Sequence, residues 1–421
     1  MRLKNTPTPV AAPTRTRRKA EPVPAPSTDH PPAPDQATPM LGGLTPRQFM
    51  QRHWQKQPLL VRQAFPGVRA PVSRAELFRL AAQDDVESRL VVRSGKGRSA
   101  RWTLGHGPLP RRSLPGLAEP GWSVLVQGLN LHVPAADALL GRFRFIPQAR
   151  LDDLMISWAS EGGGVGPHFD SYDVFLIQVH GQRRWRIGRM DDARLRQGVP
   201  LKLIANFRAE EEFVLSPGDM LYLPPRWAHD GDAVGGECMT CSVGFRAPAR
   251  DELVREVLLR VADAIDDAIS AAADSATPAG KRYGDAAQPA VADPGRVPEQ
   301  LLAFAQAGLQ AALDEPGALA QALGEYLSEP KPQVAFDAAC GPLDLAQGVR
   351  LAPGSCMLYD ELHVFLNGEA WRVAGADARL LRELSDRREL SAAALAKAGR
   401  TLRSQLLAWL ECGWLHRGLP A

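Results

Sequence analysis

The sequence predicts an α+β protein with an all-β core, a barrel or a sandwich, followed by helices and a small mixed C-terminal domain. Two patterns carry this prediction. Between residues 44 and 248, short apolar segments alternate with turns rich in glycine and proline, which is typical of all-β cores. After residue 248, apolar side chains recur at three- and four-residue steps, which indicates amphipathic helices.

Composition limits the class of protein. Of the 421 residues, 45% are hydrophobic and 23% are charged, which excludes a wholly disordered or collagen-like chain. No apolar run reaches the length of a membrane span, and the N-terminus lacks the apolar stretch of a secretory signal. A net charge of +3 does not indicate nucleic acid, and five scattered cysteines do not form a disulfide framework. We therefore expect a cytoplasmic protein with no membrane partner.

Residues 1–39 are a proline- and alanine-rich tail that contains ten of the 36 prolines. Such a segment buries too little apolar surface to offset the entropy of ordering its backbone, so we expect disorder. The cluster Arg15, Arg17, Arg18 and Lys19 allows an unspecific contact with RNA or another polyanion. A solvated basic tail is the interpretation that we prefer.

We divide the rest of the chain into a β-rich domain (40–250), a helical segment (251–335) and a C-terminal domain (336–421). A short helix leading into a strand is expected within 44–65. The later strands of the β-rich domain are expected at residues 122–127, 155–158, 174–179, 183–187, 220–223 and 238–245. Helices are expected at about 253–269 and 301–313, and such helices pair with a second copy about as often as they pack within one chain.

The C-terminal domain mixes strands at 349–351, 363–366 and 370–373 with a helix at 401–412. Short helices beside a small β-wing predict a winged-helix-like fold. No lysine or arginine occurs between Ser404 and Gly413, so a basic recognition helix for DNA is not evident. We expect a scaffold or protein-binding module.

The most informative segment is Gly-Gly-Gly-Val-Gly-Pro-His-Phe-Asp, residues 162–170. His168 and Asp170 are two residues apart, so both side chains project from one face of an extended strand. A third candidate, His229, follows a Pro-Gly-Asp turn, an apolar strand and a Pro-Pro pair. Two histidines and a carboxylate form the facial triad of non-haem Fe(II) oxygenases. Each histidine alone is better explained as a surface or capping residue, but the three together favour a metal site.

Arg183 is the second chemical signal. Strand alternation puts it on the same face as the apolar Trp185 and Ile187, whereas Arg184 and Arg186 are expected to face solvent. An arginine on an interior face is costly unless an anion satisfies it. The distal carboxylate of an iron-binding keto acid such as 2-oxoglutarate would do so as a bidentate pair. The alternative is an ion pair with a carboxylate of the barrel.

Residues 44–65, 122–147, 162–188 and 216–247 together resemble the JmjC-type 2-oxoglutarate oxygenases that hydroxylate ribosomal proteins. Within that group they are most similar to the bacterial ribosomal-protein arginine hydroxylases of the RoxA family. The glycine-rich segment followed by Asp-Val-Phe-Leu-Ile-Gln is long and specific. The resemblance implies a double-stranded β-helix (JmjC/cupin) core, a helical dimerisation segment and a C-terminal winged helix.

The same resemblance implies roles for single residues. It implies Fe(II) bound by His168, Asp170 and His229, and Arg183 on the 5-carboxylate of 2-oxoglutarate, where related eukaryotic enzymes use lysine. Ser157, on the strand before the glycine run, matches a polar position near the cosubstrate or the substrate. Glu161 stands where we expect proline, so its carboxylate either meets a substrate guanidinium or faces solvent.

The activity implied by the resemblance is hydroxylation of the β-carbon of an arginine in a large-subunit ribosomal protein. The reaction consumes O2 and 2-oxoglutarate and releases succinate and CO2, and the protein is expected to be a homodimer. Two alternatives remain: a histidine-directed ribosomal oxygenase, and a catalytically silent metal-binding cupin that serves as an interaction module. Arg183 disfavours the silent cupin, which has no need of an interior arginine. The Cys238–Cys241 pair has no partner for a zinc site, so we assign it to packing.

Overall fold

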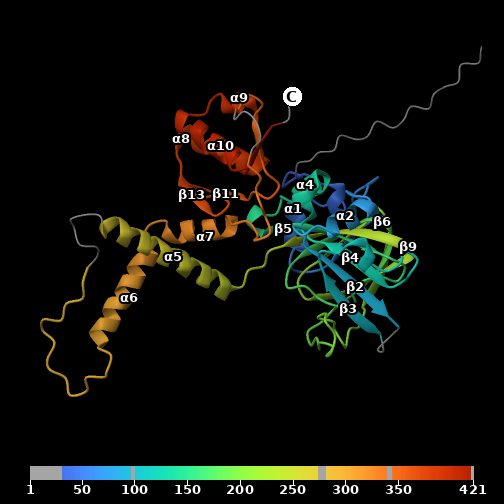
Figure 1. The fold of residues 1–421 in the computed structure, drawn as a ribbon, viewed down its shortest axis with the longest axis horizontal. Helices are drawn as coiled ribbons and strands as arrows, with labels where there is room; N and C mark the ends of the chain where they lie inside the picture. Colours follow the sequence, from blue (N-terminus) through green and yellow to red (C-terminus); the bar gives the residue numbers. More distant parts are fainter. Residues whose placement is uncertain (1–30, 96–99, 274–280, 339–343, 419–421) are drawn as a thin grey trace, which may run out of the picture.

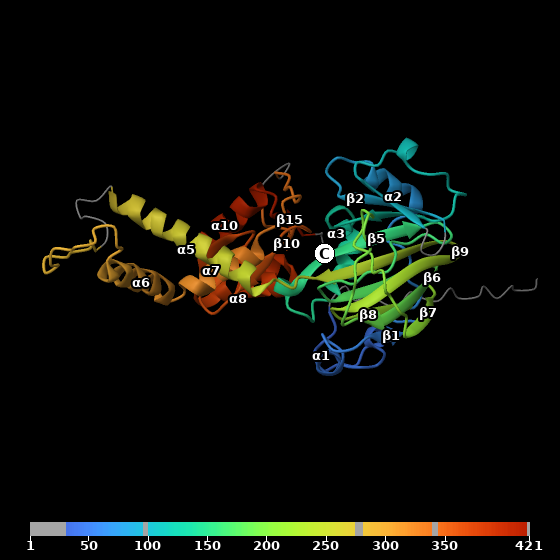
Figure 2. The same cartoon turned by 90° about the horizontal axis from the view of Figure 1, so that it is seen from below.

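The computed structural model describes residues 31–95, 100–273, 281–338 and 344–418 (Figure 1). Residues 1–30 of the expected tail and its basic cluster therefore lie outside the described residues. In the rest of the tail, the Asp35 carboxylate accepts a hydrogen bond from Nε of Arg47 at 2.6 Å. The described chain consists of a β-rich domain, a segment of three helices beside it and a C-terminal domain (Figures 1 and 2).

The β-rich domain is built on one nine-stranded antiparallel sheet. The strands are β1 (Leu59–Val61), β2 (Ser88–Ser94), β3 (Arg101–His106), β4 (Trp122–Val126), β5 (Leu151–Ala159), β6 (Val174–Arg189), β7 (Glu211–Leu215), β8 (Met220–Leu223) and β9 (Trp227–Phe245). Their order is β1-β8-β6-β9-β5-β4-β2-β3, and β7 pairs with β6. Side chains of β2 to β6 and of β9 line a common cavity, so the sheet curves around it.

The longest strands, β6 and β9, correct one expectation. The segments 174–179 and 183–187, expected as two strands, are parts of a single strand, because β6 continues through the residues between them. Gly181 has a φ of +61°, and the pairing of β6 with β9 shifts on both sides of His180. This irregularity bends the strand without ending it. Strand β9 begins at Trp227, eleven residues before the predicted 238, so that His229 lies within it.

Four helices cover the β-rich domain: α1 (Pro46–Arg52), α2 (Arg74–Ala81), α3 (Leu129–His132) and α4 (Pro134–Gly141). Helix α1 begins with a capping box, in which Thr45 Oγ1 accepts from the Gln48 amide at 3.1 Å and Gln48 Oε1 accepts from the Thr45 amide at 3.0 Å. It delivers Phe49 to the core, where the rings of Phe49 and Tyr222 lie 4.9 Å apart.

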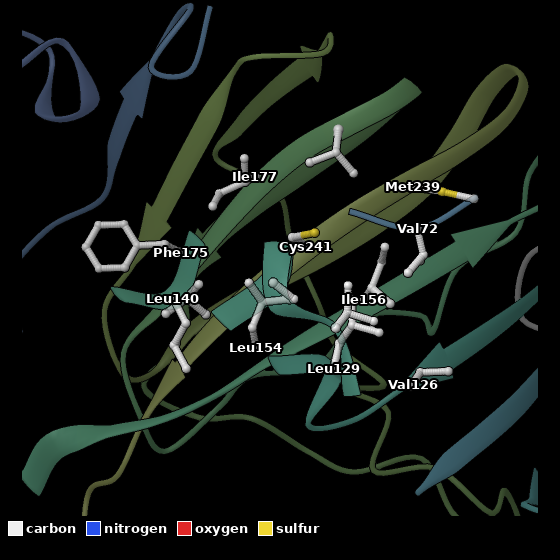
Figure 3. Packing of buried hydrophobic residues seen from close by; sticks show 14 of the residues in the cluster. Val72, Val126, Leu129, Leu140, Leu154, Ile156, Phe175, Ile177, Met239 and Cys241 are labelled. Atoms are coloured by element: carbon white, nitrogen blue, oxygen red, sulfur yellow. The ribbon is translucent and has the colours of Figure 1, made fainter. Parts of the chain in front are cut away.

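The main core lies between these helices and the sheet. Figure 3 shows Leu129 and Leu140 of the helices beside Ile156 of β5 and Phe175 of β6, all buried. Each such side chain contributes roughly 1.5–3 kcal/mol on burial. Cys241 belongs to this core, and burial raises the pKa of its thiol. Cys238 is also buried, and both thiols are free, in agreement with the packing role.

The helical segment consists of α5 (Arg250–Ala273), α6 (Glu299–Asp314) and α7 (Ala318–Ser328). The first two were predicted, and α7 was not. Helices α5 and α6 extend away from the sheet, whereas the C-terminal domain lies beside α7 (Figures 1 and 2). No helix among the described residues is both long enough and apolar enough to cross a membrane.

The C-terminal domain has two three-stranded antiparallel sheets and three helices, with its own apolar core around Leu384, Leu406 and Trp409. The elements are β10 (Val349–Leu351), β11 (Met357–Tyr359), β12 (His363–Leu366), β13 (Glu369–Arg372), α8 (Gly375–Arg387), β14 (Glu389–Leu390), α9 (Ala392–Leu395), α10 (Arg400–Glu411) and β15 (Leu415–Arg417). The predicted strands and the predicted terminal helix are present to within one residue.

Candidate metal and cosubstrate site

His168, Asp170 and His229 lie together, with one ligand atom of each within 4.8 Å of the others. His229 is on β9, and His168 forms an isolated antiparallel bridge with it. The two residues exchange backbone hydrogen bonds, from the His168 amide at 3.0 Å and from the His229 amide at 2.8 Å. Asp170 follows on the loop before β6, with Oδ2 at 3.7 Å from Nε2 of His229. Backbone hydrogen bonds between His168 and His229 therefore position the two imidazoles. The loop before β6 positions the Asp170 carboxylate.

The glycine run allows the chain to reach this position. The Gly162 amide donates to the carbonyl of Ala233, and the Ala233 amide donates to the carbonyl of Gly163. A Cβ on Gly164 would overlap with the carbonyl oxygen of Gly231. Gly166 has a φ of +81°, a conformation that other residues adopt only with strain. Glycine is therefore required where the segment crosses the backbone of β9 and turns toward His168.

Hydrogen bonds fix which nitrogen of each imidazole is free. Nδ1 of His168 donates to the carbonyl of Gly166 at 2.8 Å, and Nδ1 of His229 donates to the carbonyl of Trp227 at 3.1 Å. Nε2 of each ring therefore carries the lone pair that a metal requires. Burial, helped by the neighbouring His168, lowers the pKa of His229 to about 4, so the ring is neutral near pH 7. Two imidazoles with Nε2 turned to a common point and a carboxylate are a suitable donor set for Fe(II).

Arg183 lies on the interior of β6, with only 5% of its surface exposed. Its Nη1 donates to Oγ of Ser157 at 3.2 Å, and its guanidinium lies 5.6 Å from the Trp185 ring. Its Nε and Nη2 have no hydrogen-bond partner in the described part of the chain, and no carboxylate there forms an ion pair with it. The alternative of an internal ion pair therefore does not hold for these residues. Two orphaned donors are the arrangement that a carboxylate ligand would satisfy.

All five predicted residues line one cavity of about 390 Å³: His168, Asp170, His229, Arg183 and Ser157. The Ser157 hydroxyl also donates to the carbonyl of Thr240 at 3.4 Å, which holds it beside Arg183. A volume of this size accommodates a small dicarboxylic acid and a side chain of a second molecule. The three candidate metal ligands and the guanidinium of Arg183 therefore face the same cavity.

The loop that carries Asp170 is held by a buried carboxylate three residues further on. Asp173 accepts hydrogen bonds from Oη of Tyr222 at 2.6 Å and from Nε2 of Gln55 at 3.1 Å. Burial raises the pKa of Asp173, and these hydrogen bonds offset part of that effect. Asp173 therefore ties the loop to β8 and to the segment that follows α1.

Sequence reasoning missed the polar wall of the cavity. Arg89, Gln127, Asp152 and Asp153 line it together with the predicted residues. Arg89 lies on β2, a strand that was not predicted. The Asp-Asp pair was a usable signal, because two adjacent carboxylates interrupt an otherwise apolar strand.

Two further expectations concern charged residues near the site. Glu161 is exposed, does not line the cavity and accepts a hydrogen bond from the amide of Gly236, so it faces solvent. Arg186 was expected to face solvent, and that was wrong: it is half-buried and binds both Asp230 and Asp232. The reason is that the outer face of β9 presents these carboxylates directly beside it, at the strand that carries His229. Arg184 lies 3.6 Å from Glu212.

Two family models match the chain. A JmjC domain matches residues 138–253, which contain the candidate metal site, and a ROXA-like winged helix matches residues 309–416. The two matches fall on the β-rich domain and on the C-terminal part of the chain, and they leave most of α5 and the start of α6 between them.

Curated relatives are similar over about half of the chain. The ribosomal protein uL16 3-hydroxylase of Escherichia coli strain K12 is 44% identical over 210 residues, 49% of this chain and 54% of the relative. A probable ribosomal oxygenase of Haemophilus influenzae is 39% identical over 215 residues, 50% of this chain and 52% of the relative. The chain thus spans about half the length of the curated relatives that it matches.

Solved structures are similar over almost the whole length. E. coli ycfD superposes with a TM-score of 0.75 at 31% identity, covering 89% of this chain and 98% of ycfD. The same ribosomal oxygenase, solved in complex with cobalt and 2-oxoglutarate, gives a TM-score of 0.72 at the same identity and coverage. The fold is therefore the JmjC cupin fold with a C-terminal winged helix, as the resemblance implied. The chain belongs to the bacterial JmjC-type ribosomal oxygenases.

Proposed function

We propose that this protein is an Fe(II)- and 2-oxoglutarate-dependent hydroxylase that acts on the β-carbon of an arginine in a large-subunit ribosomal protein. The reaction would consume O2 and release succinate and CO2. One observation carries the proposal: a triad of His168, Asp170 and His229 shares a cavity with Arg183, a buried arginine that has two unsatisfied donors. A relative named uL16 3-hydroxylase and a structural neighbour solved with cobalt and 2-oxoglutarate support it.

Fe(II) would be held by Nε2 of His168, Nε2 of His229 and the Asp170 carboxylate. Arg183 would bind the distal carboxylate of 2-oxoglutarate, and Ser157 would orient the guanidinium. When bound, the metal and the keto acid supply the oxidation of an unactivated C–H bond by O2. The protein's own contribution is to place the groups and to exclude water, and the apolar side chains of Val91, Leu125 and others around the cavity serve this.

Asp153 supports an arginine as the substrate. Its Oδ2 accepts hydrogen bonds from Nε2 of Gln127 at 2.8 Å and from the amide of Gly128 at 2.7 Å. Its Oδ1 accepts no hydrogen bond from a described residue and lies near Gly244, on the cavity side. A carboxylate held by one oxygen and open at the other is a receptor for guanidinium. A histidine substrate, neutral at pH 7, would leave Oδ1 of Asp153 without a cationic partner on the cavity side, so arginine is favoured over histidine.

The catalytically silent cupin is disfavoured by Arg183. Burying a guanidinium with unsatisfied donors costs several kcal/mol, and nothing in a purely structural role would offset that cost. A bound dicarboxylate offsets it.

We also propose a homodimer that forms through the helical segment, residues 251–335. Val254, Leu258, Ile265 and Ile269 are exposed along α5, and further exposed apolar residues follow on α6: Leu301, Leu302 and Leu309. Apolar rows on helices that extend away from the sheet are the kind of surface that a second copy of the chain covers.

We also propose a role for each of the other parts of the chain. Residues 40–250 carry catalysis and residues 336–421 serve as a protein-binding module. The reaction takes place in the cytoplasm.

The test is succinate production from 2-oxoglutarate with Fe(II) and O2, in the presence of arginine-containing peptides from the host's large-subunit ribosomal proteins. Mass spectrometry would detect the gain of one oxygen and its position. Peptide-dependent turnover with the oxygen on an arginine supports the proposal. Oxygen on a histidine would move the assignment to the histidine-directed alternative, and absence of 2-oxoglutarate binding would favour the silent cupin.

A further inference from the structure

A second, smaller cavity lies between the β-rich domain and the C-terminal domain. It is lined by side chains from both, among them Asp137, Arg144 and Arg388. Asp152 and Asp153 line this cavity and also the cavity that contains the candidate metal site. The two carboxylates therefore form a wall between the active-site cavity and the interface between the domains.

A bulge puts both carboxylates in this wall. Adjacent residues of a regular strand project to opposite faces. The pairing of β5 with β9 shifts between Leu151 and Leu154, and Asp152 and Asp153 are the residues within the shift. Their side chains are 30% and 7% exposed. Two neighbouring carboxylates at one place repel each other, so a cation is needed nearby for both to be ionised.

The linker that follows α7 supplies that cation. Nζ of Lys331 lies 2.8 Å from Oδ1 of Asp152 and 3.9 Å from Oδ2 of Asp153. Arg246, the residue after β9, is another cation near Asp152, at 3.6 Å, and it also donates to the carbonyl of Leu327. Lys331 lines the cavity between the domains but not the active-site cavity. It therefore reaches the carboxylates from the side opposite to the substrate.

We propose that Lys331 is a positioning residue for the substrate cation: it neutralises Asp152 from the interdomain side and leaves Asp153 as the one carboxylate offered to a single cationic side chain. The inference rests on the proposed function, in which Asp153 receives the substrate guanidinium. It extends that function by making a residue of the C-terminal linker, far from the metal ligands in sequence, part of substrate recognition.

The charges around Asp153 determine in which direction its pKa changes when Lys331 is removed. Burial raises the pKa of Asp153, Lys331 lowers it, and Asp152 raises it. The other groups that face this pair are Arg246 on the interdomain side and, on the cavity side, Tyr172 and the Arg89–Gln127 hydrogen bond at 3.1 Å. Removing Lys331 leaves Arg246 as the remaining cation beside Asp152, so the pKa of Asp153 would rise further and Asp153 would keep its proton to a higher pH. A protonated Asp153 cannot pair with guanidinium.

The experiment compares wild type with Lys331→Met, Lys331→Arg and the control Lys397→Met, which removes an exposed lysine of the C-terminal domain. KM for the oxidised arginine peptide, kcat and the Kd of 2-oxoglutarate are measured at about pH 6 and about pH 8. We expect Lys331→Met to raise KM about ten-fold at the lower pH and less than about two-fold at the higher pH. We expect kcat and the Kd to stay within about two-fold, and Lys331→Arg and Lys397→Met to behave as wild type.

A second measurement does not depend on turnover. The pKa of the Asp153 carboxyl, followed by NMR of carbon-13-labelled aspartate in the full chain, should rise in Lys331→Met and not in Lys397→Met. An unchanged pKa overturns the proposal, as does a KM that rises equally at both pH values or falls. If wild-type protein oxidises no arginine peptide, the proposed function fails, and the pKa comparison alone decides whether Lys331 sets the charge of Asp153.

Discussion

Arg183 and Ser157 meet in the interior of the sheet, with Nη1 of the arginine 3.2 Å from the serine hydroxyl. This single hydrogen bond sets the orientation of a guanidinium whose Nε and Nη2 are otherwise unpaired among the described residues. The plane of the guanidinium is also held beside the Trp185 ring. The two unpaired donors are therefore held ready for a ligand, and this arrangement is the basis of the first prediction.

Arg183→Ala should weaken 2-oxoglutarate binding about 100-fold, because it removes a charge-assisted pair in a buried place. Metal binding should be unchanged, since Arg183 is not one of the three clustered ligands. Titration calorimetry with a redox-inert divalent ion measures both affinities. Arg184→Ala, at the next position on the strand and beside Glu212, is the matched control. An unchanged cosubstrate affinity in Arg183→Ala would mean that the carboxylate binds elsewhere.

His168→Ala should abolish activity and weaken metal binding by more than about 100-fold, since loss of a residue that only orients a ligand already costs roughly 10–100-fold. Binding of Mn(II), followed by electron paramagnetic resonance, gives the affinity without turnover. His106→Ala, an exposed histidine on β3, should leave both quantities unchanged. Retention of metal affinity in His168→Ala would contradict the assignment of the triad.

Gly164→Ala should reduce metal affinity although residue 164 carries no ligand. Its Cβ would overlap with the carbonyl of Gly231, so the segment leading to His168 must move, at a cost of roughly 1–3 kcal/mol in stability. The thermal midpoint and Mn(II) affinity should both fall. Gly308→Ala in α6, where a Cβ would have no neighbour within 4 Å, is the control and should be neutral or slightly stabilising. Wild-type metal affinity in Gly164→Ala would argue against this positioning role.

The environment of Asp219 leads us to expect that this carboxylate stabilises the fold at neutral pH and that the stabilisation is lost in acid. Burial raises its pKa, but hydrogen bonds from the Gln63 and Ser216 amides and from Arg62 outweigh this, so the pKa is lowered below 3.8. A carboxyl with a lowered folded-state pKa stabilises the protein above its unfolded value, and this contribution is lost as the pH falls through the folded value. Asp219→Ala should lower the free energy of unfolding by roughly 2–4 kcal/mol at neutral pH.

Urea unfolding at neutral and acid pH checks this. The difference between wild type and Asp219→Ala should shrink as the pH falls below about 4. Asp84→Ala, which removes an exposed aspartate, is the control for the loss of one negative charge. A difference that stays constant down to acid pH would show that the carboxylate charge is not what stabilises this turn.

Leu258→Glu on α5 should dissociate the proposed dimer at micromolar concentration, because it places a charge in the apolar row and raises the dissociation constant by at least about ten-fold. Sedimentation velocity measures the mass in solution. Asp266→Ser, on the same helix but polar and exposed, should leave the dimer intact. A wild-type protein that sediments as a monomer would contradict the proposed homodimer itself.

Some of the site residues and strands could be predicted from the sequence, and others could not, for physical reasons. His168, Asp170 and His229 were recognisable because a glycine run and a Pro-Gly-Asp turn are local signals of backbone shape. Strands β2, β3 and β7 were missed: β7, for instance, begins with two glutamates and lies off the main path of the sheet, so its pattern is weak. Asp152 and Asp153 were missed as cavity residues because strand alternation separates neighbours, and a bulge depends on the partner strand. The pairing of Lys331 with Asp152 joins distant segments, which no local pattern encodes.

Backbone hydrogen bonds hold His168 and His229 together, so their imidazoles keep their spacing whether or not an ion lies between them. Two nitrogen ligands arranged in advance, together with one carboxylate, bind divalent ions in the Irving–Williams order, in which zinc stands above iron(II). Zinc supports no redox chemistry. Where both ions are present at equal concentration, the protein would therefore fill with zinc and be inactive. The relative supply of the two metals, more than the amount of protein, would then set how much working enzyme there is.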